Sequence, residues 1–443
     1  MLFDRSEIQY KEYDYIDDSG MRTRCTDLDF LDQPASVERN SIHMYPAMFH
    51  YLLVRSLIKE FSEEGSMIFD PFCGTGVSLL EGLKLGRNTI GSDINPLAIL
   101  ISKVRCSNVN DKEYETVRKL VHEIEDSRIW DELEIDTPDV KNIDYWYSQK
   151  AIEELSRIRF WITKKLDTEL SSTTKRLLVI AFSHTSRVVS YVRKGEFKRY
   201  RIPQERIAGF SGSLHIKEVF THTLGHYSKI LYENPIPESS KCKLIYEDIR
   251  DGIPIEDGSV DLILTSPPYG DSKTTVAYDE FSSFSLEWCN GLIRKALTLN
   301  DGVLIQNKND LANKLLGSGK DEEVVESPTL SKITEEIARV SEKRARDVRR
   351  FYSDLGGIIK SLSVKLKIGG HACFLVGNRT VSGIEVPMDL IVKEMFEETG
   401  MRLEKILVRK IGNKRMPSKN SPSNVAGKTV NTMLYEYIVV MAK

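Results

Sequence analysis

The sequence has few cysteines, and they show no pattern that would bind a metal or build a disulfide framework. Six cysteines are scattered over 443 residues, without a Cys-x-x-Cys pair or a His/Cys cluster. A structural zinc site and a set of disulfides are therefore not expected. The sequence predicts a protein without a metal, located in a reducing compartment.

Two further features are missing, namely a long apolar run and a large excess of positive charge. No apolar stretch reaches the about 18 residues of a membrane span, and the acidic start, Met-Leu-Phe-Asp-Arg-Ser-Glu, does not fit a signal peptide. The formal net charge is −3, so nucleic-acid binding would depend on local basic patches. We expect a protein of the bacterial or archaeal cytoplasm, without membrane contact and long enough to bury a large core.

The first informative segment combines a strand, a glycine loop and the start of a helix. Apolar residues 67–69 precede the run Asp-Pro-Phe-Cys-Gly-Thr-Gly at 70–76, and a helical pattern begins at Val77. Glycines in such a loop let a cofactor approach the backbone, and the helix N-terminus offers free N–H groups. A second strand-like run ends at Asp93, about 20 residues after the loop, where a carboxylate can bind ribose hydroxyls.

This loop differs from the loops that bind phosphates. Gly74 and Gly76 lack the third glycine of the dinucleotide fingerprint, and the loop has no lysine for nucleotide phosphates. Asp70 would repel a pyrophosphate but can hold a cationic ligand. S-adenosylmethionine fits this loop, since it carries an amino group, a sulfonium and a ribose, and no phosphate.

The second informative segment is Ser-Pro-Pro-Tyr at 266–269, which follows an apolar strand-like run at 260–265. Two adjacent prolines fix φ twice and remove two donors, so the chain leaves the sheet in a stiff turn. The turn offers a hydroxyl, free carbonyls and an aromatic ring, which suit the exocyclic amine of a nucleobase swung out of its stack. Taken alone, the tetrapeptide is equally consistent with an ordinary strand-ending turn.

Together, the two segments resemble the amino-methyltransferases that act on DNA bases. The resemblance covers roughly residues 40–106 and 240–443, and the serine at the first motif position resembles the cytosine-N4 branch of the family. It implies an α/β fold with a Rossmann-like, doubly wound, mostly parallel sheet, and S-adenosylmethionine as cofactor. The residues that it implies for catalysis are Ser266, Pro267, Pro268 and Tyr269. Those that it implies for cofactor binding are His43, Pro46, Asp70, Pro71, Phe72, Gly74, Thr75, Gly76, Asp93, Ile94, Asn95, Asp248 and Ile249.

The chemistry of an exocyclic amine explains the motif. The amine is a poor nucleophile because its lone pair is delocalised into the ring, so its hydrogens must be held by acceptors while the lone pair faces the sulfonium methyl. The Ser266 hydroxyl and the Pro267 carbonyl can accept these hydrogens, and Tyr269 can stack on the base. Alignment of the reactants supplies up to about 7–11 kcal/mol of the barrier reduction. Cys73 does not stand in the Pro-Cys setting of cytosine-C5 enzymes and is expected to be a packing residue.

Helical and strand patterns divide the chain into an N-terminal arm, 1–40, a catalytic domain, 41–106 with 241–443, and a largely helical insertion, 107–240. The family's large insertions usually hold target recognition, so we assign DNA reading to 107–240. Segments 290–350 and 409–424 remain open as contributors. The elements expected in addition to those above are helices at 46–60, 96–106, 120–133, 148–166, 173–183 and from 330, and strands at 243–246, 369–376 and 435–441.

Two basic segments are candidates for DNA binding. Cations alternate with aromatic residues between 187 and 206, and a proline-broken basic run with amides covers 408–424. Such patterns can follow a phosphate backbone and stack on bases, although a solvated basic face is the alternative. The candidate residues are Arg193, Lys194, Lys198, Arg199, Arg201, Lys414, Arg415 and Asn420.

The leading hypothesis is a site-specific DNA methyltransferase that modifies the N4 amine of a flipped cytosine, as the protective half of a restriction–modification or related defence system. Its partners would be double-stranded DNA and a cognate restriction endonuclease. Adenine-N6 methylation is the nearest alternative. A guanine-N2 RNA methyltransferase and an inactive DNA-binding subunit are the others.

Overall fold

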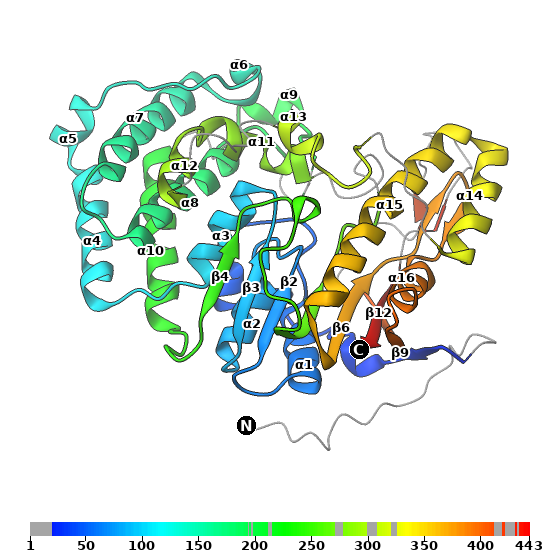
Figure 1. The fold of residues 1–443 in the computed structure, drawn as a ribbon. Coiled ribbons are helices and arrows are strands. Elements are labelled where there is room, and N and C mark those ends of the chain that lie inside the picture. Colours follow the sequence, from blue (N-terminus) through cyan, green and yellow to red (C-terminus); the bar gives the residue numbers. More distant parts are fainter. Residues whose placement is uncertain are drawn as a thin grey trace.

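The computed structural model describes residues 20–193, 195, 198–210, 215–270, 278–298, 308–319, 326–411, 419–420, 430–431 and 434–443. Lys194, Lys414 and Arg415 lie outside the described residues, and nothing is described of the side chain of Asn420. The centre of the fold is an eight-stranded sheet of order β1-β9-β12-β6-β5-β2-β3-β4 (Figure 1). Its strands are β1 (Arg22–Arg24), β2 (Met67–Asp70), β3 (Asn88–Ser92), β4 (Cys242–Ile245), β5 (Val260–Thr265), β6 (Leu366–Val376), β9 (Arg402–Lys410) and β12 (Tyr435–Ala442).

The sheet is mostly parallel, as the sequence predicts. Only β12 runs antiparallel, and it pairs with β6 on one side and with β9 on the other. The chain passes from β2 to β3 and β4 at one edge and then returns to β5 on the other side of β2. At such a switch point, a crevice opens outside the carboxyl ends of the two central strands, and ligands of open α/β sheets bind there.

Strand residues alternate between two apolar layers, as the two-residue period of a strand requires. Leu262 and Leu264 of β5 pack with α1 (Tyr51–Phe61) on one face, and Ile263 joins the cluster on the other face. The second layer is built by α14 (Pro328–Val340), α15 (Glu342–Lys365) and α16 (Met388–Glu397). The two layers hold the strands from both faces, and Leu316 of one layer and Val77 of the other also line the cavity at the strand ends.

The insertion is helical, and its core is continuous with the catalytic sheet. Trp161, Phe182 and Phe220 belong to the same buried cluster as Trp288 and the apolar face of α3 (Pro96–Arg105). The helices of this unit stand beside the β4 edge of the sheet in Figure 1. They are α4 (Asp111–Glu125), α5 (Ser127–Glu132), α6 (Ile143–Trp146), α7 (Gln149–Leu166), α8 (Ser172–Val188), α9 (Gln204–Ile207) and α10 (Ile216–Glu233), with α11 (Tyr278–Trp288) and α12 (Leu292–Leu297) packed on α8.

Residues 20–40 differ from the expected arm because they are built into the fold. β1 pairs in parallel with β9, and the Arg22 guanidinium bonds the buried Asp389 carboxylate of α16 at 2.6 Å. Two two-stranded antiparallel sheets complete the described strands, β7 (Arg379–Val381) with β8 (Ile384–Val386) and β10 (Lys419–Asn420) with β11 (Val430–Asn431). No helix among the described residues is long and apolar enough to span a membrane.

Candidate active site

A cavity partly open to solvent lies at the switch point of the sheet, with about 990 Å³ of empty space when the solvent at its mouth is included. Four of its lining residues carry carboxylates, and among the described lining residues only Lys314 is basic. Such a lining favours a cationic ligand over a phosphate. The lining comes from seven chain segments: residues 45–49, 70–75 with Val77 and Ser78, 92–95, 247–249, Ser266 with Pro268, Tyr278, and Leu311 with 314–316.

The glycine loop approaches the cavity with its backbone exposed. Gly74 and Gly76 have φ values of +49° and +76°, which belong to the left-handed region that favours glycine. A Cβ added at Gly74 would meet no protein atom within 4 Å, whereas one at Gly76 would lie 2.8 Å from Ser102 Oγ. Gly74 therefore leaves room for a ligand, and Gly76 allows the loop to pack against α3. The neighbouring Cys73 is buried, as expected of a packing residue, and burial raises the pKa of its thiol well above the ordinary value.

Asp70 ends β2 and holds three elements together. Its Oδ1 accepts hydrogen bonds from Thr265 Oγ1 at 2.6 Å and from the Phe72 N–H at 3.1 Å. Its Oδ2 accepts one from Ser78 Oγ on α2 (Val77–Lys84). Burial raises the pKa of Asp70 to about 6, and these hydrogen bonds oppose the rise. Asp70 thus lines the cavity and also joins the glycine loop to the end of β5.

Asp93 follows β3 and faces the glycine loop. Its Oδ2 accepts from the Gly74 N–H at 3.0 Å, and its Oδ1 accepts from the Asn95 N–H at 2.7 Å. Burial raises the pKa of this carboxyl to about 6, while the backbone hydrogen bonds oppose the rise. A carboxylate has about four acceptor sites, so lone pairs remain for ribose hydroxyls. Asp93 therefore lies in the cavity beside the glycine loop, and its role in binding a ribose stays a prediction.

An aromatic wall that the sequence did not predict stands beside Asp93. Asn95 caps α3 through Oδ1, and its Nδ2 donates to Tyr45 Oη at 2.9 Å and to Ser282 Oγ at 2.8 Å. Tyr45 in turn stacks on Tyr278, with ring centroids 5.9 Å apart. Both tyrosines line the cavity. Tyr45 lies between the expected residues His43 and Pro46, whereas Tyr278 stands in no recognisable motif.

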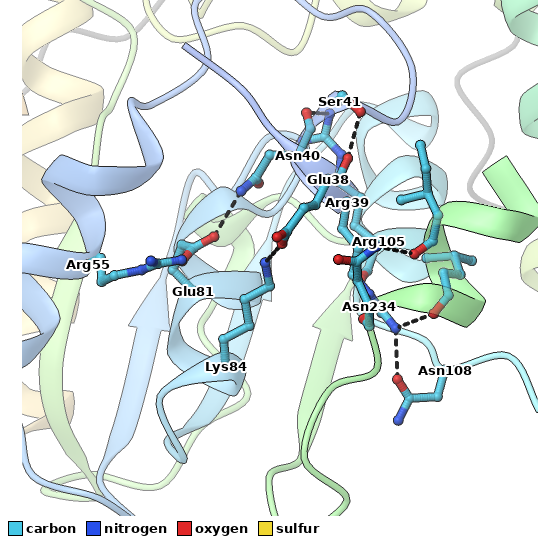
Figure 2. A network of polar contacts seen from close by, with 12 residues as sticks. Glu38, Arg39, Asn40, Ser41, Arg55, Glu81, Lys84, Arg105, Asn108 and Asn234 are labelled. Carbon is cyan, nitrogen blue, oxygen red and sulfur yellow. Dashed lines mark hydrogen bonds and ion pairs between the residues drawn. The ribbon is translucent and has the colours of Figure 1, made fainter. Parts of the chain in front are cut away.

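Buried arginines hold the segment that supplies Tyr45 and Pro46. Arg105 is fully buried and donates to the carbonyls of Asn40, Ile42 and Thr75, at 2.8 Å, 2.7 Å and 3.2 Å. Arg39, also fully buried, makes its hydrogen bonds to four backbone carbonyls and to Asn108 Oδ1 (Figure 2). Burial lowers the pKa of both guanidinium groups to about 10, so both remain charged at neutral pH.

His43 differs from the expected cofactor residue because its ring faces the insertion. Its Nε2 lies 2.9 Å from Ser183 Oγ of α8, and its Nδ1 lies 2.6 Å from the Met44 carbonyl oxygen. The residue is buried and is absent from the cavity lining, whereas Pro46 lines it. The left-handed backbone of His43, with φ of +60°, turns the chain so that the following residues reach the cavity.

Asp248 and Ile249 line the cavity opposite the glycine loop. The Asp248 carboxylate is engaged by Arg250, with Nη2 2.7 Å from Oδ2 and Nε 3.0 Å from Oδ1. Burial opposes ionisation of Asp248, but the contacts with Arg250 outweigh it and lower its pKa. The chain that follows α13 (Lys308–Ala312) covers this side of the cavity and is anchored by a 2.8 Å hydrogen bond from the Gly317 N–H to Asp354.

The Ser-Pro-Pro-Tyr turn leaves β5 at the rim of the same cavity. Ser266 and Pro268 line it, whereas Pro267 is buried and Tyr269 packs partly into the apolar layer of α15 and α16. Ser266 Oγ donates to Tyr269 Oη at 3.1 Å. The hydroxyl of the expected catalytic serine and the carboxylates of the expected cofactor loop thus share one cavity.

The basic candidates of the insertion separate into buried and exposed residues. Arg199 lies over the rings of Trp146 and Phe284 and approaches Glu287 at 3.5 Å, so it supports the fold and is not available to a phosphate. Arg201 is held over Tyr145, while Arg193 and Lys198 are exposed. Alternation of charge with aromatics does not distinguish an arginine packed between rings from one that faces solvent.

The strand order of the sheet is that of a Rossmann-like methyltransferase. The cavity at the switch point and the carboxylates that line it are consistent with this class. A family model described as DNA methylase matches residues 3–104. The chain is 34% identical over 436 residues to the Type II methyltransferase M.MvaI of Kocuria varians. This alignment covers 94% of this chain and 93% of that protein. The chain is 24% identical to the Type II methyltransferase M.BsoBI of Geobacillus stearothermophilus, over 92% and 86% of the two chains. The chain belongs to the type II DNA methyltransferases, and S-adenosylmethionine is its cofactor.

Among solved structures, a SAM-dependent methyltransferase of Methanosarcina mazei aligns with 90% of this chain and 98% of its own. The identity is 9% and the TM-score is 0.28, so the superposition carries no argument. The residues present in the cavity fit the cofactor independently of it. Asp93 matches a ribose, the open backbone at Gly74 admits close approach, and the acidic lining matches a positive charge.

The glycine loop yields a matched pair of variants. Gly74→Ala and Gly76→Ala introduce a similar left-handed strain, so the difference between them reports on space. We expect Gly76→Ala to lower the free energy of unfolding by about 1–3 kcal/mol more than Gly74→Ala does, because the added methyl group meets Ser102. Gly74→Ala should remain folded but bind S-adenosylmethionine more weakly, as measured by calorimetry. Equal melting curves, or wild-type affinity in Gly74→Ala, would contradict these assignments.

Cofactor affinity should depend on pH through Asp93. Its pKa of about 6 in the free protein means that the carboxyl is largely protonated at pH 5, whereas ribose hydroxyls bind the ionised acceptor more strongly. We expect S-adenosylmethionine to bind about tenfold more weakly at pH 5 than at pH 7.5, and Asp93→Asn to reduce this ratio. Stability of the free protein runs in the opposite direction, since a raised carboxyl pKa makes the fold bind protons more tightly and lose stability as pH rises from 4 to 6. A pH-independent affinity would exclude this role.

Proposed function

We propose that the chain transfers a methyl group to the N4 amine of a cytosine flipped out of double-stranded DNA. The observation that supports this most directly is the position of Ser266, whose side chain stands at the rim of the cavity that holds the expected cofactor residues. Serine at this position favours the cytosine-N4 branch over the adenine-N6 branch. A flipped base would enter through the open side of the cavity.

The bound cofactor supplies an activated methyl group on a sulfonium. The chain's own part is to hold the amine in line with that methyl. The Ser266 hydroxyl and the Pro267 carbonyl accept the two amine hydrogens, which frees the nitrogen lone pair from the ring. Tyr278 lines the cavity and offers a ring on which the base can stack, whereas the ring expected in this role, Tyr269, packs into the apolar layer beside the turn. No strong base is needed before attack, because the amine loses its proton after it has become positively charged.

DNA reading is assigned to the insertion at 107–240, with the segments 290–350 and 409–424 as further contributors. The exposed side of the 191–202 hairpin supports this assignment. Val192 pairs with Arg201 across it, and Arg199 anchors it inward, so that Arg193, Lys198 and the half-exposed Tyr200 face outward. Cations beside an exposed ring suit phosphates and an unstacked base. A cognate restriction endonuclease would be the partner in the cell.

Ser266→Ala tests the catalytic assignment. Loss of the acceptor should reduce turnover by about 10- to 100-fold, the effect of one strong hydrogen bond, with unchanged affinity for S-adenosylmethionine. Mass spectrometry of DNA treated with the wild-type enzyme should identify the product as N4-methylcytosine. Methyl groups on adenine N6, or on RNA, would refute the proposed function. A parallel loss of cofactor affinity would refute the role given to Ser266.

The hairpin yields a second test. The double variant Arg193→Ala, Lys198→Ala removes two exposed cations. Its plot of log affinity for DNA against log salt concentration should have a slope that is shallower by about 0.9 for each phosphate that is no longer neutralised. Its melting temperature should not change. Arg199→Ala is the matched control, since it removes a cation of the same hairpin from between two rings, and should lower the melting temperature. An unchanged salt slope in the double variant would place the DNA elsewhere.

A further inference from the structure

A chain of hydrogen bonds leads from the serine of the Ser-Pro-Pro-Tyr turn into the sheet. Ser266 Oγ donates to Tyr269 Oη at 3.1 Å, and Tyr269 Oη donates to Glu436 Oε1 at 3.1 Å. Arg409 Nη1 donates to the second oxygen, Oε2, of Glu436 at 2.9 Å. No sequence motif connects these four residues, since the last two lie more than a hundred positions after the turn.

The topology of the sheet explains how Glu436 reaches the site. β12 is antiparallel to its neighbours, so its first residues lie at the edge where β5 and β6 end, and Tyr437 pairs with Val376. β9 ends at the same edge, and Arg409 is the direct register partner of Glu436. Tyr269 therefore spans the end of β6 to reach the carboxylate.

The carboxylate is held rigidly and away from water. The side chains of Arg409 and Glu436 are 5% and 14% exposed. Arg409 also donates to the carbonyls of Leu28 and Asp29, at 2.8 Å and 3.1 Å. These carbonyls belong to the segment that follows β1, so the N-terminal strand completes the burial of the pair. A pair fixed in this way keeps one geometry while a substrate binds.

The direction of each hydrogen bond follows from the number of protons available. An ionised carboxylate only accepts, so the single proton of the Tyr269 hydroxyl is directed to Glu436. Tyr269 Oη has no second proton, so toward Ser266 it can only accept a hydrogen bond. That hydrogen bond uses the single proton of the serine hydroxyl. Ser266 Oγ is left with lone pairs for a further partner. An amine whose hydrogens must be accepted is the partner that this arrangement suits.

We propose that Glu436 is a positioning residue for methyl transfer, which acts through Tyr269 to orient the Ser266 hydroxyl as an acceptor for the substrate amine. This proposal rests on the proposed function, in which Ser266 accepts an amine hydrogen. The negative charge at the end of the chain also strengthens each hydrogen bond of the series as the amine becomes positive. Arg409 holds the carboxylate in place.

Glu436→Gln provides a sharp test because it reverses the series. The one oxygen of glutamine is attracted to the Arg409 guanidinium, which leaves the NH₂ group facing Tyr269. Tyr269 must then accept from Gln and donate to Ser266, and the serine proton turns toward the substrate. We expect the single-turnover rate of methyl transfer to fall by about 10- to 100-fold, with S-adenosylmethionine affinity within twofold of wild type. Glu404→Gln is the matched control, since it removes a carboxylate from β9 that pairs with His371 at 3.0 Å, and its rate should not change.

Tyr269→Phe and the double variant separate orientation from a general structural effect. Without the tyrosine hydroxyl the series is already broken, so adding Glu436→Gln to Tyr269→Phe should cause no further loss. A rate within threefold of wild type in Glu436→Gln, or losses that multiply in the double variant, would overturn the proposal. If Glu436→Gln does not fold, Tyr269→Phe decides alone, because an unchanged rate there excludes the series.

Failure of this inference is distinguishable from failure of the proposed function. Product analysis of the wild-type reaction shows which base carries the methyl group. If the methyl group is on adenine N6, the proposed cytosine specificity is wrong. The rates of the Glu436 and Tyr269 variants still test the hydrogen-bond series in that case, because adenine also offers an amine. If the methyl group is on cytosine N4 and the rate of Glu436→Gln is normal, only the role of Glu436 fails.

Discussion

The hydrogen bond from Thr265 Oγ1 to Asp70 Oδ1, 2.6 Å long and buried, connects the two halves of the active site. Asp70 opens the glycine loop, and Thr265 directly precedes the Ser-Pro-Pro-Tyr turn. Ser78 holds the other carboxylate oxygen and adds the start of α2 to the same junction. Placing a carboxyl there is costly, as its raised pKa shows, and the donors around it offset that cost. This carboxylate therefore ties the glycine loop to the Ser-Pro-Pro-Tyr turn at the ends of the paired strands β2 and β5.

A second constraint fixes the wall of the cavity. Arg105 connects the carbonyls of residues 40–43 to Thr75 in the glycine loop, and a single cation holds both without an acidic partner in these contacts. The hydrogen bonds from the guanidinium group fix the backbone carbonyls that precede His43. This anchoring stabilises the segment in which His43 and Ala47 adopt left-handed backbone conformations. The wall that carries Tyr45 is thereby tied to the glycine loop.

Local chemistry explains what the sequence could predict. The glycine loop and the double proline dictate backbone conformation through their own stereochemistry, so both segments fold as expected. Strands such as β5 and β6 were readable because apolar residues dominate the ends that lead to the site, 262–264 and 372–376. β1, β9 and α10 were not predicted, because charged residues or residues of low helix propensity obscure the hydrophobic periodicity of these segments. Only packing or pairing with neighbouring elements stabilises them.

Side-chain partners explain what could not be predicted. His43 and Arg199 stand in patterns typical of ligand contact, yet one faces Ser183 and the other lies between rings. Tyr278 and Glu436 reach the site from distant elements and belong to no motif. A pattern gives the chemistry of a side chain, whereas its direction depends on the helix or strand that packs beside it.

By itself, the sequence determined the class of the fold, the cofactor loop and the turn at the end of β5, because each depends on short-range backbone rules. Only the tertiary structure decided which groups meet at the switch point. The antiparallel course of β12, which places Glu436 behind the turn, and the burial of Arg105 beneath the loop are consequences of strand order, and strand order is set by long-range packing.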